Sequence, residues 1–262
     1  LGPCQETSFI PEMHPFNWRG WWNFGTGALG DMGCHLIDIP FKALGLKYPT
    51  DVECSVGSVY EEMWTANYFP EGCPPSSSVS LNFEATEKNN LPLQMTWSDG
   101  GIKPFHPDLI PADVPIEPNG VIMIGEKGVI TCDAYGSDPK MYIKGQNVIV
   151  GEKVKNNEPE WGHQRKWVDA CKAGFNSSEH LSLTSSFNYS GPLTETVLMG
   201  NIAIRSYMLR EKGLNGKSQF IGRKKLEWDG NAMKIKNLDA ANQFVGRDYR
   251  KGWDCLLYTS DA

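Results

Sequence analysis

The chain has 262 residues, of which 40% are hydrophobic and 21% are charged, and its formal net charge is −6 at pH 7. This length and composition indicate a globular protein with a large core, arranged as one big domain or two small ones. The negative charge disfavours nucleic acid as a partner, and no apolar run is long enough to span a membrane, so we expect neither.

Both ends of the chain indicate a fragment. The sequence begins with Leu1 inside a turn-like phrase and shows no signal peptide, so we expect that any targeting segment has been lost upstream. Residues 254–262 resemble a translated sequencing adapter, and we expect them to be a non-native tail. The seven cysteines are scattered without a Cys-x-x-Cys pair or zinc spacing, which predicts reduced thiols and no metal site.

The first predicted elements are a loop and a helix. Residues 1–24 are rich in proline, aromatic and turn residues, so we expect an ordered loop. Apolar residues then recur at threes and fours, which predicts a helix over 26–44. Pro40 must kink or split this helix, because it lacks an amide donor and clashes with the carbonyl of Leu36.

Residues 51–150 change to an alternating pattern, which predicts strands. We expect them at 52–60, 79–83, 91–97, 121–124, 129–132, 141–144 and 148–150. Short turns at 125–128 and 145–147 join successive strands, so the pairing must be mainly antiparallel. Five prolines within 98–119 predict a long irregular loop, and one face of the sheet is free to meet a ligand or partner.

The remaining chain predicts further helices and a hairpin. A helix over 163–173 ends at Gly174, and a second over 194–209 begins just after Pro192. Short strands are expected at 225–228 and 233–236 around a turn at 229–231, followed by a short helix that opens at Asp239.

The segment 25–35, Gly-Thr-Gly-Ala-Leu-Gly-Asp-Met-Gly-Cys-His, carries the most chemistry. Asp31 and His35 are four positions apart, so on a helix they share one face and can address the same small molecule. Glycines at every third position from Gly27 to Gly33 indicate that something approaches the backbone closely. The alternative for the Asp–His pair is an ordinary surface contact worth a few tenths of a kcal/mol.

The same glycines match a dinucleotide-binding fingerprint. Gly25-x-Gly27-x-x-Gly30 has the required spacing, and Asp51 lies near the distance expected for a ribose-binding acid. That fingerprint works only between a buried strand and a helix. Residues 17–24 are not a Val/Ile-rich run and Asp51 follows a turn, so we disfavour this interpretation.

Residues 16–35 resemble the start of the C-terminal domain of bacterial Gfo/Idh/MocA proteins, the glucose–fructose oxidoreductase and inositol dehydrogenase family. Further similar phrases follow in the same order, so the resemblance covers about residues 1–253. They lie at 97–101, 119–121, 125–128, 167–172, 189–195 and 226–230.

The resemblance implies an α/β fold of the α+β type, with an open, mostly antiparallel sheet and helices packed on one face. Residues 1–253 would form the substrate-binding and oligomerisation domain, with the sheet packing against a second copy. A Rossmann domain binding NAD or NADP, and a Glu-Lys-Pro motif whose lysine contributes to catalysis, would precede Leu1. Neither occurs here, so the fragment alone is expected to be inactive, and cytoplasmic and periplasmic locations both stay open.

The resemblance also assigns roles to individual residues. His35 would be the general base that takes a hydroxyl proton from a sugar, sugar derivative or cyclitol, and Asp31 would orient the alcohol or hold the imidazolium. Gly27 and Gly30 would let the helix approach the nicotinamide. Candidate substrate contacts, each with a purely structural alternative, are Trp18, Arg19, Trp22, His163 and Tyr189.

Three functions remain open at this stage. The first is an NAD(P)-dependent oxidoreductase acting on a sugar or polyol. The second is a relative that uses NAD for transient oxidation while it cleaves a glycosidic bond. The third is a non-catalytic oligomerisation or carbohydrate-binding module, which needs no acid–base pair.

Overall fold

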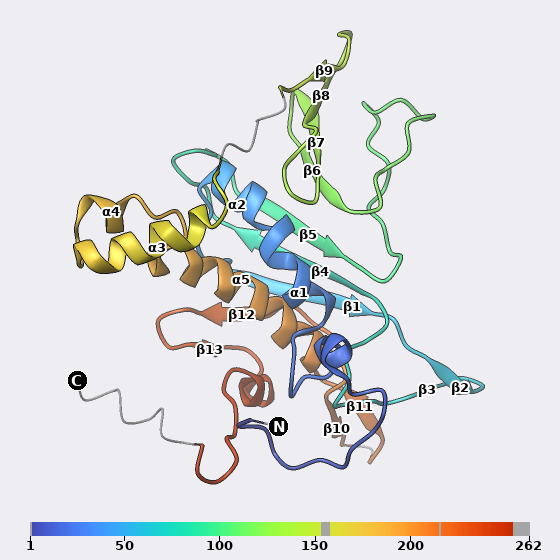
Figure 1. Cartoon of the computed structure of the whole chain (residues 1–262). Coiled ribbons are helices and arrows are strands. Elements are labelled where there is room, and N and C mark those ends of the chain that lie inside the picture. Colours follow the sequence, from blue (N-terminus) through green and yellow to red (C-terminus); the bar gives the residue numbers. More distant parts are fainter. Residues whose placement is uncertain (1, 153–157, 215, 254–262) are drawn as a thin grey trace. The chain divides into compact units, whose positions relative to one another are not determined.

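The computed structural model describes residues 2–152, 158–214 and 216–253, and it confirms the mixed α+β class with antiparallel sheets (Figure 1). Contacts divide the chain into two compact units. The first unit comprises Leu1–Cys34, Ala43–Phe105 and Glu195–Ala262, and the second comprises His35–Lys42 and His106–Thr194. The predicted tail at 254–262 lies outside the described residues.

A five-stranded antiparallel sheet organises the first unit, with strand order β13-β12-β1-β4-β5. Its strands are β1 (Asp51–Val56), β4 (Ser77–Phe83), β5 (Leu93–Ser98), β12 (Leu226–Asp229) and β13 (Lys234–Ile235). The alternation predicted from the sequence is confirmed in β4, where Val79, Leu81 and Phe83 are buried and the residues between them are partly exposed. The sheet therefore has one apolar face and one polar face.

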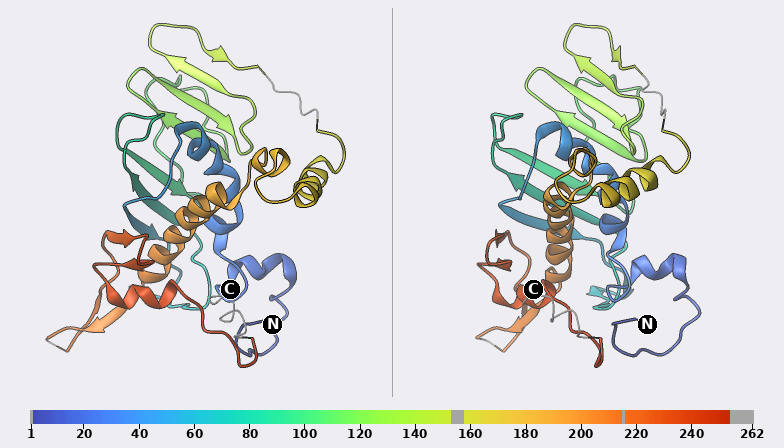
Figure 2. Two further views of the ribbon diagram at one scale, coloured as in Figure 1. Left: turned by 90° about the vertical axis from the view of Figure 1, so that its left-hand side faces the viewer. Right: turned by 60° about the vertical axis from the view of Figure 1, so that its left-hand side comes forward.

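Two helices cover the apolar face: α1 (Gly27–Leu36) and α5 (Phe187–Ser206), through the parts that belong to this unit (Figures 1 and 2). Gly200 on α5 marks the point of closest approach. A Cβ there would lie 2.4 Å from Leu29 Cδ2 on α1 and 3.4 Å from Val79 Cγ1 on β4. The absence of a side chain at Gly200 lets the three elements meet.

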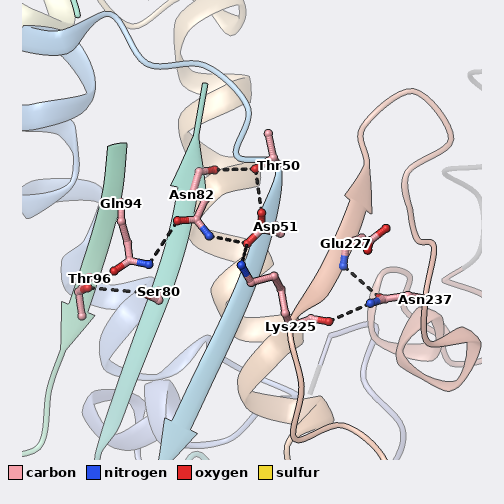
Figure 3. A network of polar contacts seen from close by, with 9 residues as sticks. All are labelled: Thr50, Asp51, Ser80, Asn82, Gln94, Thr96, Lys225, Glu227 and Asn237. Atoms are coloured by element: carbon pink, nitrogen blue, oxygen red, sulfur yellow. Dashed lines mark hydrogen bonds and ion pairs between the residues drawn. The ribbon is translucent and has the colours of Figure 1, made fainter. Parts of the chain in front are cut away.

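The polar face carries a hydrogen-bonded network, and Figure 3 shows α5 behind these strands. Asn82 Nδ2 donates to Asp51 Oδ1 at 2.6 Å, and Lys225 Nζ lies 3.4 Å from the same oxygen. Burial alone would raise the pKa of Asp51, but the hydrogen bonds from Asn82 and Thr50 and the charge of Lys225 outweigh it and lower the pKa.

Smaller elements complete the first unit. They are the 3₁₀-helices η1 (Pro15–Gly20) and η2 (Asp239–Phe244) and two hairpins, β2 (Tyr60–Glu62) with β3 (Thr65–Ala66) and β10 (Arg210–Lys212) with β11 (Ser218–Phe220). The short helix predicted at Asp239 is therefore present in the 3₁₀ form. Neither hairpin is predicted by the sequence pattern, and neither are the helical turns of η1.

The second unit is built on a four-stranded antiparallel meander, β6 (Gly120–Ile124), β7 (Gly128–Asp133), β8 (Lys140–Ile143) and β9 (Ile149–Val150). Val129 pairs with Tyr142, and both pack against Ile110 from the proline-rich loop. That loop is irregular, as predicted, and it contributes apolar side chains to this small core. The unit also contains α3 (Gly162–Ala173) and α4 (Ser178–Leu181).

The helix predicted over 26–44 is split, as the proline requires. α1 ends at Leu36 and α2 (Asp38–Leu44) follows, with Pro40 as its third residue. A proline is tolerated in a first turn because the amide that it lacks would have no helical partner there.

The predicted start of the long helix is wrong. α5 begins at Phe187, and Pro192 lies inside it rather than before it. A proline within a helix costs about 3 kcal/mol. The preceding turn is anchored, since the Tyr189 hydroxyl donates to Asp38 Oδ1 and its ring lies 5.8 Å from that of Phe41.

None of the described helices has both the length and the apolar character needed to cross a membrane.

The Asp51 network generates a prediction about stability and pH. Because folding lowers the pKa of Asp51, its contribution is complete above the unfolded-state pKa and is lost as pH falls through the folded-state value. Asp51→Asn should destabilise the chain by about 1 kcal/mol at neutral pH. The variant should also lose stability less steeply than the wild type between about pH 5 and pH 3, measured by urea denaturation.

Glu53→Gln serves as the matched control, because Glu53 is an exposed carboxylate two residues further along β1. It should leave the loss of stability at acid pH the same as in the wild type. An equally steep loss in Asp51→Asn and the wild type would contradict the stabilising role of the Asp51 carboxylate.

Candidate functional site

Helix α1 carries both Asp31 and His35, one turn apart. In the described chain the residues before α1 form η1 and a turn, with an isolated bridge between Trp21 and Gly72. Asp51 is the first residue of β1 and belongs to the polar network of the sheet. The strand–turn–helix context of a dinucleotide fingerprint is therefore not formed around these glycines.

The glycines before and within α1 pack against this unit's own chain. A Cβ on Gly25 would lie 2.4 Å from Arg19 Cα, and one on Gly30 would lie 1.7 Å from Thr26 Oγ1. Gly27 has a φ of +67°, and a Cβ there would lie 3.1 Å from Cys73 Sγ. Internal packing thus explains why glycine occupies these positions. The role of Gly27 and Gly30 toward a cofactor stays a prediction.

Asp31 forms an ion pair with Arg19 Nη1. Arg19 is itself fixed, since its Nε donates to Phe16 O at 3.2 Å and its guanidinium carbon lies 4.5 Å from the Phe16 ring centroid. The side chains of Arg19 and Asp31 remain 45% and 32% exposed, so both are accessible to a ligand from solvent. Arg19 therefore orients the carboxylate that the sequence analysis placed in the catalytic pair.

The two tryptophans have different environments. Trp18 Nε1 donates to Met13 O at 3.0 Å, and the exposed indole ring lies 6.0 Å from that of Phe24. Trp22 is half-buried, and the guanidinium carbon of Arg205 lies 5.6 Å from its ring centroid. Trp18 thus offers an open aromatic surface, whereas Trp22 belongs to the packing around α5.

His35 is exposed at the end of α1, and its ring contacts Tyr135 edge-on with centroids 5.5 Å apart. Asp133 Oδ1 holds the turn that bears Tyr135, accepting from Tyr135 N at 2.9 Å and Ser137 N at 2.7 Å. Tyr135 itself is 71% exposed. Tyr135 is not among the predicted site residues, because nothing in a β-turn sequence indicates which distant helix the turn will contact.

Tyr189 and His163 lie in separate settings within the second unit. Tyr189 donates to Asp38 Oδ1, and burial followed by the Asp38 hydrogen bond and charge raises the pKa of its phenol. Its hydroxyl proton is therefore committed to a structural contact. His163 is exposed in the first turn of α3, and among the described contacts none joins it to His35 or Tyr135.

The cysteines of the described residues are free thiols. Burial is the main cause that raises the pKa of Cys54 and of Cys73 to about 12, which leaves both as inert thiols. Cys34 is exposed between Asp31 and His35, and its thiol lies 3.6 Å from Asp31 O. Within the described residues, no group of three or more His, Cys, Asp or Glu side chains is placed to hold a metal ion.

A scan against models of known protein families found no match to this chain, and a search of curated proteins found no significant similarity. We therefore infer a function from the residues of α1 and their contacts.

The packing at Gly25 gives a testable expectation. Gly25→Ala should destabilise the chain by about 1–3 kcal/mol, because the new Cβ meets the Arg19 backbone, which cannot rotate away. Gly20→Ala should change stability by no more than about 0.5 kcal/mol, because nothing lies within 4 Å of a Cβ there. Chemical denaturation of both variants tests the pair, and equal effects would contradict the packing argument.

Proposed function

We propose that this chain is the substrate-binding and catalytic part of an NAD(P)-dependent oxidoreductase that acts on a sugar, sugar derivative or cyclitol. The observation that carries the proposal is α1, which bears an exposed imidazole and an oriented carboxylate one turn apart. The resemblance of the sequence to Gfo/Idh/MocA proteins supports the same reaction class.

His35 suits the role of general base. An imidazole in general titrates near pH 6.5, so its neutral form accepts a proton from an alcohol at physiological pH. The exposed ring of His35 is accessible to a substrate hydroxyl, and the Tyr135 edge limits how that ring can turn. The proton moves from the hydroxyl oxygen to an imidazole nitrogen, and the histidine becomes an imidazolium.

Asp31 and the exposed ring of Trp18 position the substrate. The Asp31 carboxylate accepts hydrogen bonds from sugar hydroxyls, while its pairing with Arg19 keeps it oriented. The exposed ring of Trp18 offers a face on which the C–H groups of a sugar ring can stack. Arg19 contributes further N–H donors to the same substrate.

The glycines around the start of α1 do not leave an open cradle for a dinucleotide phosphate. The positions of Gly25, Gly27 and Gly30 that could cradle a phosphate are already filled by Arg19, Cys73 and Thr26. The proposal therefore assigns cofactor binding mainly to a Rossmann domain outside this chain. When bound, the nicotinamide would supply the acceptor for the hydride released from the carbinol carbon.

Two other functions remain outcomes of the test. An NAD-dependent glycosidase would use the same Asp31 and His35 pair but would release an aglycone without net reduction of the cofactor. A non-catalytic carbohydrate-binding module would bind sugar with or without His35.

The decisive experiment uses this chain joined to the dinucleotide-binding domain that the proposal assigns to it. His35→Ala should lower kcat/KM for sugar oxidation by about 10²–10⁴-fold, because the general base is lost. The fall in kcat/KM at acid pH, where the base is protonated, should flatten in the variant. Nicotinamide absorbance reports oxidation, and a chromogenic glycoside reports bond cleavage.

His14→Ala is the control, because His14 is an exposed histidine in the N-terminal loop. It should leave both kcat/KM and the pH profile unchanged. Full turnover in His35→Ala would remove the catalytic assignment, and aglycone release without absorbance change would favour the glycosidase.

We also propose that the polar face of the five-stranded sheet packs against a second copy of the chain. Ser80 Oγ and Thr96 Oγ1 lie 3.5 Å apart on the neighbouring strands β4 and β5, and Gln94 Nε2 donates to Asn82 Oδ1 at 3.3 Å (Figure 3). Hydroxyl and amide groups both donate and accept, so such a face can be complementary to itself across a two-fold axis.

Ser80→Arg should convert the oligomer to a monomer in sedimentation velocity, because it places a long cation at the centre of this face. Gln219→Arg adds the same charge on the exposed hairpin strand β11 and should leave the oligomer intact. A wild-type chain that is monomeric at high concentration would overturn this proposal.

A further inference from the structure

Arg205, in the last turn of α5, is a cation packed among aromatic rings. Its guanidinium carbon lies 4.3 Å from the Phe244 ring centroid and 5.6 Å from that of Trp22. The Nε atom is buried and has no hydrogen-bond partner within the described residues. None of the carboxylates described in the structure forms an ion pair with Arg205.

Asn201 lies one helical turn before Arg205 and therefore projects from the same side of α5. Asn201 is 5% exposed, and neither its amide nitrogen nor its amide oxygen has a hydrogen-bond partner in the described part of the chain. A buried polar group left without a partner costs about 1–3 kcal/mol. Two such groups on one side of a helix therefore require a physical explanation.

A second guanidinium, that of Arg247, lies at the segment that contains Trp22. Arg247 Nη2 donates to Trp22 O at 3.1 Å and to Asn23 O at 2.7 Å, which brings it to the segment whose indole contacts Arg205. Burial and then the like charge of Arg247 lower the pKa of Arg205, so the two cations are close enough to repel each other. An anion placed between them would relieve both costs.

We propose that a small oxyanion, one that carries a carboxylate or phosphate group, binds at the Arg205 cluster. This cluster consists of Asn201, Arg205 and Arg247. Because Trp22 and Phe244 pack against the guanidinium of Arg205, its edge N–H groups are the part that remains to bind. Two edge N–H groups match two oxygens of a carboxylate or phosphate in fork geometry. The Asn201 amide adds a donor from the same side of α5.

The cluster belongs to the first unit and shares no residue with the Asp31 and His35 pair. The two proposals therefore fail independently. A chain inactive toward sugars can still bind an anion here, and a chain that binds no anion can still oxidise a sugar.

The test measures anion binding to the chain with inorganic phosphate and acetate as probes, against chloride at equal ionic strength. We expect saturable binding by calorimetry and a higher thermal midpoint with at least one oxyanion. Phosphate binding alone identifies a phosphate site, and acetate binding alone identifies a carboxylate site. A wild-type response no greater than that to chloride would overturn the proposal.

Arg205→Gln should weaken oxyanion binding at least about tenfold, because the charged fork is lost. Arg210→Gln is the matched control: Arg210 stacks on Phe220 at 4.3 Å, the separation of Arg205 from Phe244, but lies on the exposed hairpin. Arg210→Gln should bind as the wild type does, and equal loss in both variants would overturn the assignment.

Asn201→Asp keeps the test open if Arg205→Gln fails to fold. An aspartate one turn from Arg205 supplies the missing negative charge within the chain. The thermal midpoint without phosphate should rise, and the response to phosphate should disappear. A lower midpoint with an intact phosphate response would show that no anion lies at Arg205.

Discussion

The contact of α5 with α1 and β4 at Gly200 is the constraint on which the first unit depends. Leu29 and Val79, the two side chains that would meet a Cβ there, are almost completely buried. Tight packing of this kind allows little rotation of either helix against the sheet. α1 is therefore held at a defined angle, and the direction in which it presents Asp31 follows from a glycine more than 160 residues away in the chain.

Local chemistry made much of the fold predictable. The alternation in β4 and the break that Pro40 imposes depend on near neighbours in the sequence, and both are present in the structure. The start of α5 differs from the prediction, because Pro192 indicates a helix that begins just after it, whereas the structure has Pro192 inside the helix. The Tyr189 contact with Asp38 stabilises the extra turn, and it joins residues 151 positions apart, which no local pattern contains.

The candidate site was predictable only in part, for the same reason. The spacing of Asp31 and His35 follows from helix periodicity alone. The partners that orient them do not follow from it. Arg19 pairs with Asp31 from η1, and Tyr135 contacts His35 from the turn after β7. The unpaired Asn201 amide was equally invisible, because an apolar helix face predicts burial without saying which polar atoms lack partners.

The thiol of Cys34 has a practical consequence for probing the α1 helix. It is exposed between Asp31 and His35, and in a Cys171→Ser background the other exposed thiol of the described residues is removed. The raised pKa values of Cys54 and Cys73 keep those thiols from competing for an alkylating reagent at neutral pH. A fluorophore attached through Cys34 would stand on the turn that joins the two side chains. Its emission would then report directly when a molecule arrives at this helix, without any assay of turnover.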